Sequence, residues 1–284
     1  MKNELKINKP LVSVNWLCQH KDATNLLVLD ATIKKVTSNE LVHQSEKKHI
    51  KEARFFDLKK VFSDQNAPFP NTCLSAEKFE QEARKIGINK NAAIVVYDDI
   101  GIYSSPRVWW LFKLMGFTNI AVLDGGLPAW KEAGFYIENP ITYSGKSGDF
   151  KSTYQKELIC DSSNVFSAIS DTTVQLLDAR SKGRFYGTEP EPRAAIRGGR
   201  IPNSNSMPYG SLLEDGKMKS ESNLRAIFKE TNPGAKKMIF TCGSGITACV
   251  LALGAEMLKY TNYAVYDGSW TEWGSLQHLP VEKE

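Results

Sequence analysis

Short apolar runs alternate with longer helical patterns along the chain. In the first half, the apolar runs cover residues 27–29, 93–97 and 120–123, and each ends in a polar or glycine-containing turn. A helical pattern at 106–115 stands between the second and third runs. Short buried strands separated by helical segments are typical of a parallel sheet with crossover helices. The pattern therefore predicts an α/β fold.

The second half repeats this order. Apolar runs at 175–180, 238–242 and 263–268 match those of the first half, and a helical run extends to about residue 259. A tryptophan follows the third run in both halves, Trp130 after Asp124 and Trp273 after Asp267, at the same spacing. So many shared landmarks indicate an internal repeat.

We predict tandem duplicated domains, each a parallel sheet flanked by helices. Their boundaries are residues 1–140 and 157–284. The segment 141–156 is rich in Gly, Ser, Thr and Lys with little apolar periodicity, and we interpret it as a linker.

Composition adds size and compartment to this picture. With 284 residues the chain is long for one core, and 42% hydrophobic with 24% charged residues is ordinary for a globular protein. The net charge of +4 suits small anionic substrates and indicates neither nucleic acid nor membrane as a partner. The N-terminal ten residues lack the apolar core of a signal peptide. Five cysteines without metal-ligand spacing predict free thiols in a reducing compartment, so we expect a cytoplasmic protein without a metal site.

The loop at Cys242 carries the strongest chemical signal. Cys242 follows an apolar strand, and Gly243 and Gly245 lie between it and an apolar helix. A glycine-rich turn that enters a helix directs several backbone N–H groups into one concavity. Such a setting stabilises a thiolate, which is the nucleophilic form of cysteine. Cys242 is thus the predicted nucleophile, whereas the other four cysteines (Cys18, Cys73, Cys160 and Cys249) are expected in the core.

The loop 242–247, the Asp-Gly-Ser-Trp stretch 267–270 and the duplicated framework together resemble the rhodanese superfamily. More narrowly, they are similar to 3-mercaptopyruvate sulfurtransferases, over almost the whole chain. The resemblance implies that a persulfide on Cys242 carries sulfur from 3-mercaptopyruvate to an acceptor, releasing pyruvate without a cofactor. Acceptors would be thioredoxin, a small thiol or cyanide. It also implies a non-catalytic first domain, in which Asp98 stands where Cys242 stands in the second.

Substrate contacts are predicted from an arginine-containing segment at 182–193. Guanidinium groups bind carboxylates through planar pairs of donors. The resemblance implies that Arg184 and Arg193 bind the carboxylate and keto groups of the donor. The loop residues Gly243, Gly245, Ile246 and Thr247 would line the same site. Arg197 and Arg200 are interpreted as surface arginines.

Two further residues are candidates for proton transfer. The resemblance gives Ser244 a part in moving the proton when the donor is cleaved. It also points to His49, although the turn after His49 lacks the Pro and Gly of the family pattern. A lone histidine is as often structural, so both interpretations of His49 stay open.

Three other functions compete with this interpretation. A thiosulfate:cyanide sulfurtransferase would favour basic residues inside the loop, where this chain has Gly243 and Ser244. A phosphatase would need an arginine to close the loop, and Ala248 occupies that place. A non-catalytic binding module built on a rhodanese domain would typically lack the cysteine.

Overall fold

The computed structural model describes residues 4–35, 48–234 and 236–283, and the chain forms two compact units. The first unit spans 1–63, 74–154 and 215–217, and the second spans 64–73, 155–214 and 218–284. Segment 64–73 therefore belongs to the second unit although it lies within the first half of the sequence. Most of the predicted linker, up to residue 154, groups with the first unit.

The first unit contains a five-stranded sheet in the order β1-β6-β5-β2-β4, in which all neighbours are parallel. Its strands are β1 (Leu11–Val12), β2 (Leu26–Asp30), β4 (Arg54–Phe55), β5 (Ala93–Tyr97) and β6 (Ile120–Leu123). A separate antiparallel pair is formed by β3 (His49–Ile50) and β7 (Ile137–Glu138). The helices are α1 (Val14–His20), α2 (Ala76–Lys85), α3 (Ser105–Leu114) and α4 (Gly126–Glu132).

The second unit contains a sheet in the order β10-β9-β13-β14-β8, again parallel throughout. Its strands are β8 (Ile159–Cys160), β9 (Val174–Asp178), β10 (Ser204–Ser206), β13 (Lys237–Thr241) and β14 (Tyr263–Tyr266). The two short strands β11 (Leu213–Glu214) and β12 (Lys217–Met218) pair with each other. The helices are α5 (Ser162–Ala168), α6 (Lys182–Tyr186), α7 (Glu221–Thr231), α8 (Ala248–Met257) and α9 (Ser269–Trp273), with 3₁₀ turns η1 (Lys156–Leu158) and η2 (Tyr209–Leu212).

The two sheets have the same topology. Read from the opposite edge, the second sheet runs β8-β14-β13-β9-β10, and each strand has its counterpart at the same place in the first sheet. The predicted tandem α/β fold is therefore confirmed. The sequence pattern located the three inner strands of each sheet but not the edge strands, which are only two or three residues long.

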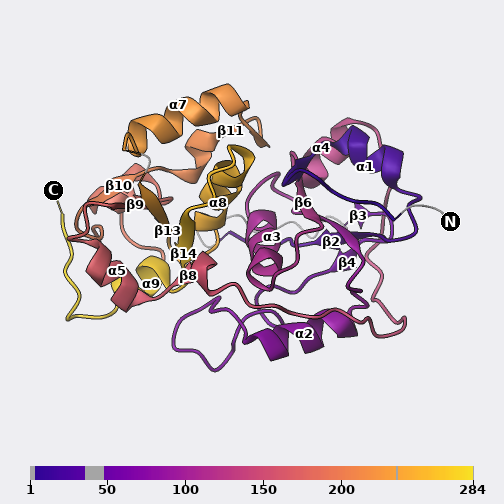
Figure 1. Cartoon of the computed structure of the whole chain (residues 1–284), viewed down its shortest axis with the longest axis horizontal. Coiled ribbons are helices and arrows are strands. Elements are labelled where there is room, and N and C mark those ends of the chain that lie inside the picture. The colour runs from indigo at the N-terminus through magenta and orange to yellow at the C-terminus, as the bar shows by residue number, and fades with distance from the viewer. Residues whose placement is uncertain (1–3, 36–47, 235, 284) are drawn as a thin grey trace. The chain divides into compact units, whose positions relative to one another are not determined.

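Each sheet is covered by helices on both faces. In the first unit, α1 and α4 lie together at one side of the sheet and α2 at the other (Figure 1). The α2 face is filled by aromatic rings, including Phe79 and Phe112 at a centroid distance of 5.2 Å. All five residues of the central strand β5 are buried. Burial on both faces explains why the apolar runs in the sequence are continuous rather than alternating.

In the second unit, α8 is the most deeply buried helix. Eight of its ten residues are buried, and it packs against β13 and β14. Trp270 and Trp273 of α9 join the core on the other face of the sheet. A helix that is apolar on every side is stable only inside a core, so its first turn is held firmly next to the end of β13.

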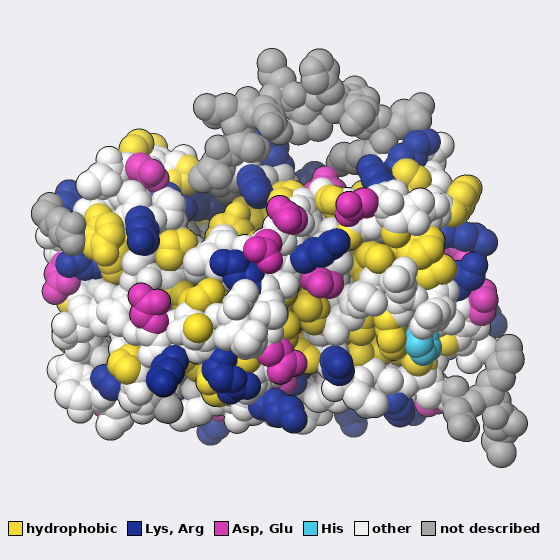
Figure 2. All heavy atoms as spheres, turned by 90° about the horizontal axis from the view of Figure 1, so that it is seen from above, with side chains coloured by type: hydrophobic (Ala, Val, Ile, Leu, Met, Phe, Trp, Pro, Cys, Tyr) yellow, Lys and Arg dark blue, Asp and Glu magenta, His cyan; other side chains and the backbone are white. Residues whose placement is uncertain are grey.

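Charged side chains of both signs are interspersed on the face shown in Figure 2. The small positive excess is thus not gathered into one field on that face. None of the described helices has the length and apolarity required to cross a bilayer.

Candidate active site

Cys242 lies immediately after the central strand of the second sheet. The last residue of β13, Thr241, pairs with Asp178 of β9, and α8 begins at Ala248. Between them Gly245 has a φ of +77°, a left-handed conformation that favours glycine. Only 1% of Cys242 is exposed. The thiol is therefore held at the carboxyl end of the sheet beside the N-terminus of a ten-residue helix, a position that favours negative charge.

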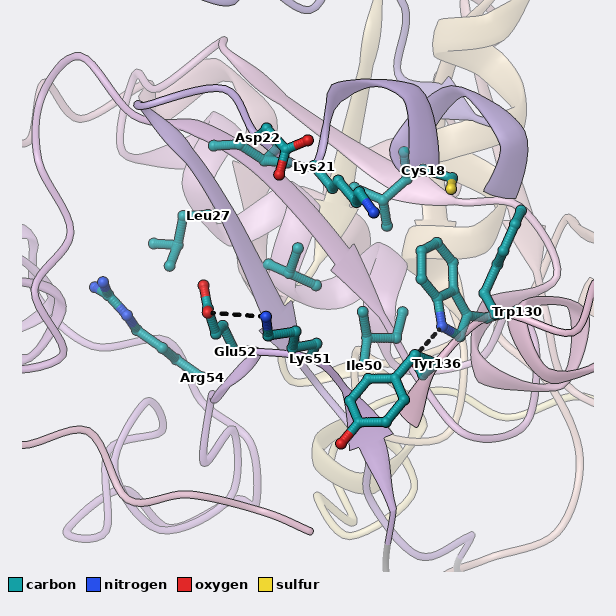
Figure 3. Close-up of a pocket in the computed structure, with 14 residues that line it drawn as sticks. Cys18, Lys21, Asp22, Leu27, Ile50, Lys51, Glu52, Arg54, Trp130 and Tyr136 are labelled. Carbon is teal, nitrogen blue, oxygen red and sulfur yellow. Dashed lines mark hydrogen bonds and ion pairs between the residues drawn. The ribbon is translucent and has the colours of Figure 1, made fainter. Parts of the chain in front are cut away.

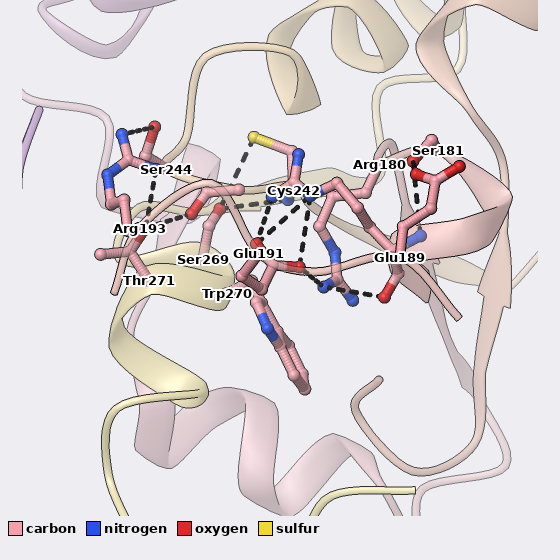
Figure 4. A network of polar contacts seen from close by, with 12 residues as sticks. Arg180, Ser181, Glu189, Glu191, Arg193, Cys242, Ser244, Ser269, Trp270 and Thr271 are labelled. Atoms are coloured by element: carbon pink, nitrogen blue, oxygen red, sulfur yellow. Dashed lines mark hydrogen bonds and ion pairs between the residues drawn. The ribbon is translucent and has the colours of Figure 1, made fainter. Parts of the chain in front are cut away.

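The start of α9 fixes this loop from the side. The Ser269 hydroxyl accepts hydrogen bonds from the N–H groups of Cys242 (3.2 Å) and Gly245 (3.1 Å), and its oxygen lies 4.0 Å from the Cys242 sulfur (Figure 4). It donates its own proton to the Tyr266 carbonyl at 2.8 Å. The N–H groups of Trp270 and Thr271 donate to the carbonyls of Cys242 and Gly243, each at 2.9 Å. The loop is preorganised by these contacts before any substrate binds.

Ser269 adopts this role at a conformational cost. Its φ is +49°, which is unfavourable for a residue with a Cβ. The corresponding residue of the first unit is Gly126, with a φ of +52°. The repeat that lacks the cysteine has the residue best suited to this backbone, whereas the repeat with the cysteine has a serine. The hydrogen bonds of the Ser269 hydroxyl therefore explain why a serine, and not a glycine, occupies this strained backbone conformation.

A buried ion-pair network holds Arg184 next to the loop. Glu191 binds Arg184 at 2.6 Å through one oxygen and Arg180 at 2.8 Å through the other. Arg180 also pairs with Asp178 at 2.7 Å and is fully buried. Burial opposes the charge of Arg180, but Asp178 and Glu191 outweigh it and raise the pKa of this guanidinium. In the described part of the chain, Nη1 is the Arg184 nitrogen that makes no hydrogen bond, so it is available to an anion.

Gly243 provides room for Arg184. A Cβ at residue 243 would lie 2.9 Å from Nη2 of Arg184. The guanidinium thus approaches the backbone directly beside Cys242, and a larger residue at 243 would displace it.

Arg193 approaches the same loop at Ser244, the second residue after Cys242. Its guanidinium lies 3.4 Å from the hydroxyl of Ser244 and 3.4 Å from that of Thr271. Ser244 also accepts a hydrogen bond from the Asn71 side chain at 2.9 Å. The guanidiniums of Arg184 and Arg193 therefore both lie beside the loop, which contains no Lys, Arg, Asp or Glu.

The structure brings together most of the predicted site residues. Arg184, Arg193, Ser244 and the loop 242–247 all belong to the second unit. The side chain of Ile246 is buried, and the carbonyls of Ile246 and Thr247 accept hydrogen bonds from the first turn of α8. These two residues therefore shape the loop from within.

His49 belongs to the other compact unit. It belongs to β3 of the first unit and is buried, with Nε2 3.6 Å from the Glu138 carboxylate of β7. Burial and the proximity of Glu138 are compatible with a structural role, and a part in proton transfer stays a prediction.

The other cysteines differ in burial. Cys160 and Cys249 are core residues as expected, and burial raises the pKa of the Cys160 thiol to about 12. Cys18 and Cys73 are half-buried rather than fully buried, and Cys18 packs against the core of the first unit. The Cys73 thiol donates to the Asp267 carboxylate at 3.1 Å, because segment 64–73 packs into the second unit.

The interpretation of Arg197 as a surface arginine was wrong. Its guanidinium is partly buried and donates to carbonyls at and after the end of α9, those of Trp273, Gly274, Leu276 and Leu279. Arg200 pairs with Glu282 at 3.3 Å. Of these four arginines, Arg184 and Arg193 are the two that lie beside the Cys242 loop.

In the first unit, Asp98 fills the loop that corresponds to the Cys242 loop. One carboxylate oxygen accepts hydrogen bonds from the N–H groups of Tyr103, Ser104 and Ser105 at 2.8–2.9 Å and from the Ser105 hydroxyl at 2.7 Å. The side chain is fully buried. This loop therefore surrounds the carboxylate of one of its own residues. The strand-loop-helix geometry of the repeat is thus suited to binding negative charge.

A cavity of about 320 Å³ in the first unit offers less chemistry (Figure 3). Two of its charged residues, Lys51 and Glu52, pair with each other at 3.7 Å. Arg54 donates to the carbonyls of Ile86 and Gly87, and the Trp130 indole donates to that of Tyr136. Among the described residues, no cluster of His, Cys, Asp and Glu has the arrangement of a metal site. The Cys242 loop is thus the candidate active site.

Four neighbours of the loop were missed from the sequence: Asn71, Glu191, Ser269 and Thr271. Ser269 could have been found, because it lies in the Asp-Gly-Ser-Trp landmark and replaces the glycine of the other repeat. Glu191 lies between two prolines in the arginine segment. Asn71 gave no signal, since it lies far from the loop in sequence.

Comparison with known proteins agrees with this geometry. The rhodanese-like domain model matches residues 13–133 and 163–276. The human 3-mercaptopyruvate sulfurtransferase is 35% identical over 93% of this chain and 92% of its own length. The Arabidopsis thaliana mitochondrial thiosulfate/3-mercaptopyruvate sulfurtransferase 1 is 34% identical over 99% of this chain and 80% of its own.

A rat thiosulfate sulfurtransferase is equally similar, at 34% identity over 93% of this chain and 92% of its own. The crystal structure of the Escherichia coli 3-mercaptopyruvate sulfotransferase SseA superposes with a TM-score of 0.82 at 30% identity, covering 93% of this chain and 99% of that one. The duplicated sheet, the cysteine loop and these matches lead to one conclusion: the chain belongs to the rhodanese family and carries a rhodanese-like domain in each half.

Proposed function

We propose that this protein is a 3-mercaptopyruvate sulfurtransferase in which Cys242 carries the transferred sulfur. The observation that supports it most is the approach of Arg184 and Arg193 to the uncharged loop that holds Cys242. These guanidiniums would bind the carboxylate and keto groups of the donor. The thiolate would then lie within reach of its sulfur.

The reaction needs no external oxidant or reductant. The Cys242 thiolate attacks the sulfur of mercaptopyruvate, a new S–S bond forms, and the C–S bond breaks. Its electron pair moves into the keto group to give the enolate of pyruvate. The proton of the donor thiol ends on the methyl carbon of pyruvate, and a persulfide anion stays on Cys242. An acceptor thiol or cyanide then removes the outer sulfur.

The loop also bears on donor choice, because identity to relatives named for both donors does not decide it. Thiosulfate is a compact dianion, and cations beside the attacked sulfur would suit it. Residues 243 and 244 are Gly and Ser, and the positive charge reaches the loop from the separate arginine segment. That arrangement suits a ketoacid, whose carboxylate is remote from its sulfur.

The test measures loading and donor preference together. Intact mass after incubation with mercaptopyruvate should show one added sulfur atom in the wild type and none in Cys242→Ser. Cys249→Ser is the matched control, and it should still load. With one common acceptor, kcat/KM for mercaptopyruvate should exceed that for thiosulfate by at least about tenfold, or roughly 1.4 kcal/mol. Loading of Cys242→Ser would refute the proposed nucleophile, and a preference for thiosulfate would favour the alternative donor.

The acceptor and the compartment are finer parts of the proposal. Thioredoxin, small thiols and cyanide can be compared as acceptors in the same assay. The predicted cytoplasmic location contrasts with the mitochondrial Arabidopsis relative, and fractionation of the source cells distinguishes the two.

A further inference from the structure

Asn71 contacts the Cys242 loop from a segment far away in sequence but in the same compact unit. Its Nδ2 lies 2.9 Å from the Ser244 hydroxyl and 3.2 Å from the Ser244 carbonyl oxygen. A carbonyl can only accept, so the nitrogen of the amide must face Ser244. Asn71 is buried and has a φ of +64°, which asparagine tolerates better than most residues.

These contacts fix the direction of the Ser244 hydroxyl. Its oxygen has two lone pairs, and two donors face it, Asn71 at 2.9 Å and Arg193 at 3.4 Å. With both lone pairs engaged, the hydroxyl proton is directed to a third partner. We propose that Asn71 is a positioning residue that makes Ser244 a hydrogen-bond donor to the keto oxygen of the sulfur donor.

This inference rests on the proposed function and deepens it. When the C–S bond breaks, negative charge develops on the keto oxygen, and a donor fixed beforehand stabilises that charge most effectively. Two hydrogen bonds received by Ser244 polarise its O–H bond and strengthen its own donation. Because a neutral amide does not titrate in the working range, Asn71 keeps this polarity at every pH at which the enzyme acts.

Asn71→Asp is the sharpest test. Aspartate has nearly the same shape and also tolerates a positive φ, but the ionised carboxylate can only accept. The Ser244 hydroxyl would then donate its hydrogen bond to this carboxylate instead of to the keto oxygen of the sulfur donor. We expect kcat/KM for mercaptopyruvate to fall at least about tenfold at neutral pH (roughly 1.4 kcal/mol) and to recover as the carboxyl becomes protonated. Asn66→Asp introduces the same charge at an exposed residue of the same segment, and it should show neither the loss nor the new pH dependence.

A double-mutant cycle separates positioning from folding. If Asn71 acts through Ser244, Asn71→Asp should change the single-turnover rate of persulfide formation less than about twofold in a Ser244→Ala background. The inference would be overturned if Asn71→Asp slowed persulfide formation by the same factor with and without Ser244. It would also be overturned if the Asn71→Asp variant matched wild type at neutral pH. Either result would leave the proposed function intact as long as wild type gains one sulfur from mercaptopyruvate; absence of that gain would count against the function itself.

Discussion

At the scale of single residues, the Glu191 carboxylate links the buried Arg180 to Arg184, which lies beside the Cys242 loop. It neutralises part of the charge of both Arg180 and Arg184, and only 3% of its side chain is exposed. Removing the charge while keeping the shape would leave two guanidiniums close together with one anion fewer. Such an imbalance inside a protein costs more than the loss of an exposed pair.

Glu191→Gln is therefore expected to lower kcat/KM for mercaptopyruvate at least about tenfold and the free energy of unfolding by about 1–3 kcal/mol. Steady-state kinetics and urea unfolding measure the two effects. Glu189→Gln is the matched control, because Glu189 is exposed and accepts from Ser181. Equal losses in both variants would show that the charge of the segment matters rather than the bridge.

At the scale of elements, the strand-loop-helix of Cys242 depends on the first residue of α9. Ser269 supplies one oxygen to two backbone N–H groups of the loop, and it does so from a left-handed conformation. The two effects of this residue have opposite signs for stability. They can be separated by substitution.

Ser269→Gly and Ser269→Ala should lose turnover to a similar extent, at least about tenfold, because both remove the oxygen. Ser269→Ala should also be less stable than Ser269→Gly, by about 1 kcal/mol, since alanine keeps the strained φ. Kinetics and thermal unfolding of both variants check this, with Ser275→Ala as control, whose hydroxyl donates to the Thr271 carbonyl. A large difference in turnover between Gly and Ala would contradict the assigned role of the oxygen.

The elements were predictable where one local pattern specified them. The inner strands, the Cys242 turn and α8 follow from apolar runs and glycine spacing, and the arginine segment follows from its composition. The edge strands and Asn71 were not predictable, because two-residue strands have no periodicity and the Asn71 contact joins residues 173 positions apart. The positive φ of Ser269 is a property of the folded backbone, and the residue type alone does not predict it.

At the scale of the whole molecule, the two repeats use the same loop in different ways. Asp98 has no chemical role in the proposed reaction, but four donors converge on one of its buried oxygens. Asp98→Asn should leave turnover within a few-fold of wild type. It should also lower the free energy of unfolding by about 2 kcal/mol or more, because an amide presents N–H groups to some of these donors and has no charge.

Urea unfolding together with steady-state kinetics measures both effects, with Asp99→Asn at the exposed neighbour as the control. An Asp98→Asn variant as stable as Asp99→Asn would contradict the structural role. A loss of turnover of about 10³-fold, near 4 kcal/mol in the barrier, would show instead that the first unit takes part in the chemistry.

The filled loop of the first unit also fixes the capacity of the protein as a sulfur carrier. Two intact cysteine loops in one chain would compete for the same donor, and sulfur captured by one would have to be exchanged with the other before delivery. The Asp98 carboxylate permanently occupies one of the two loops. Each chain should therefore accept a single equivalent of sulfur however large the excess of donor, and a titration with mercaptopyruvate should have one end point.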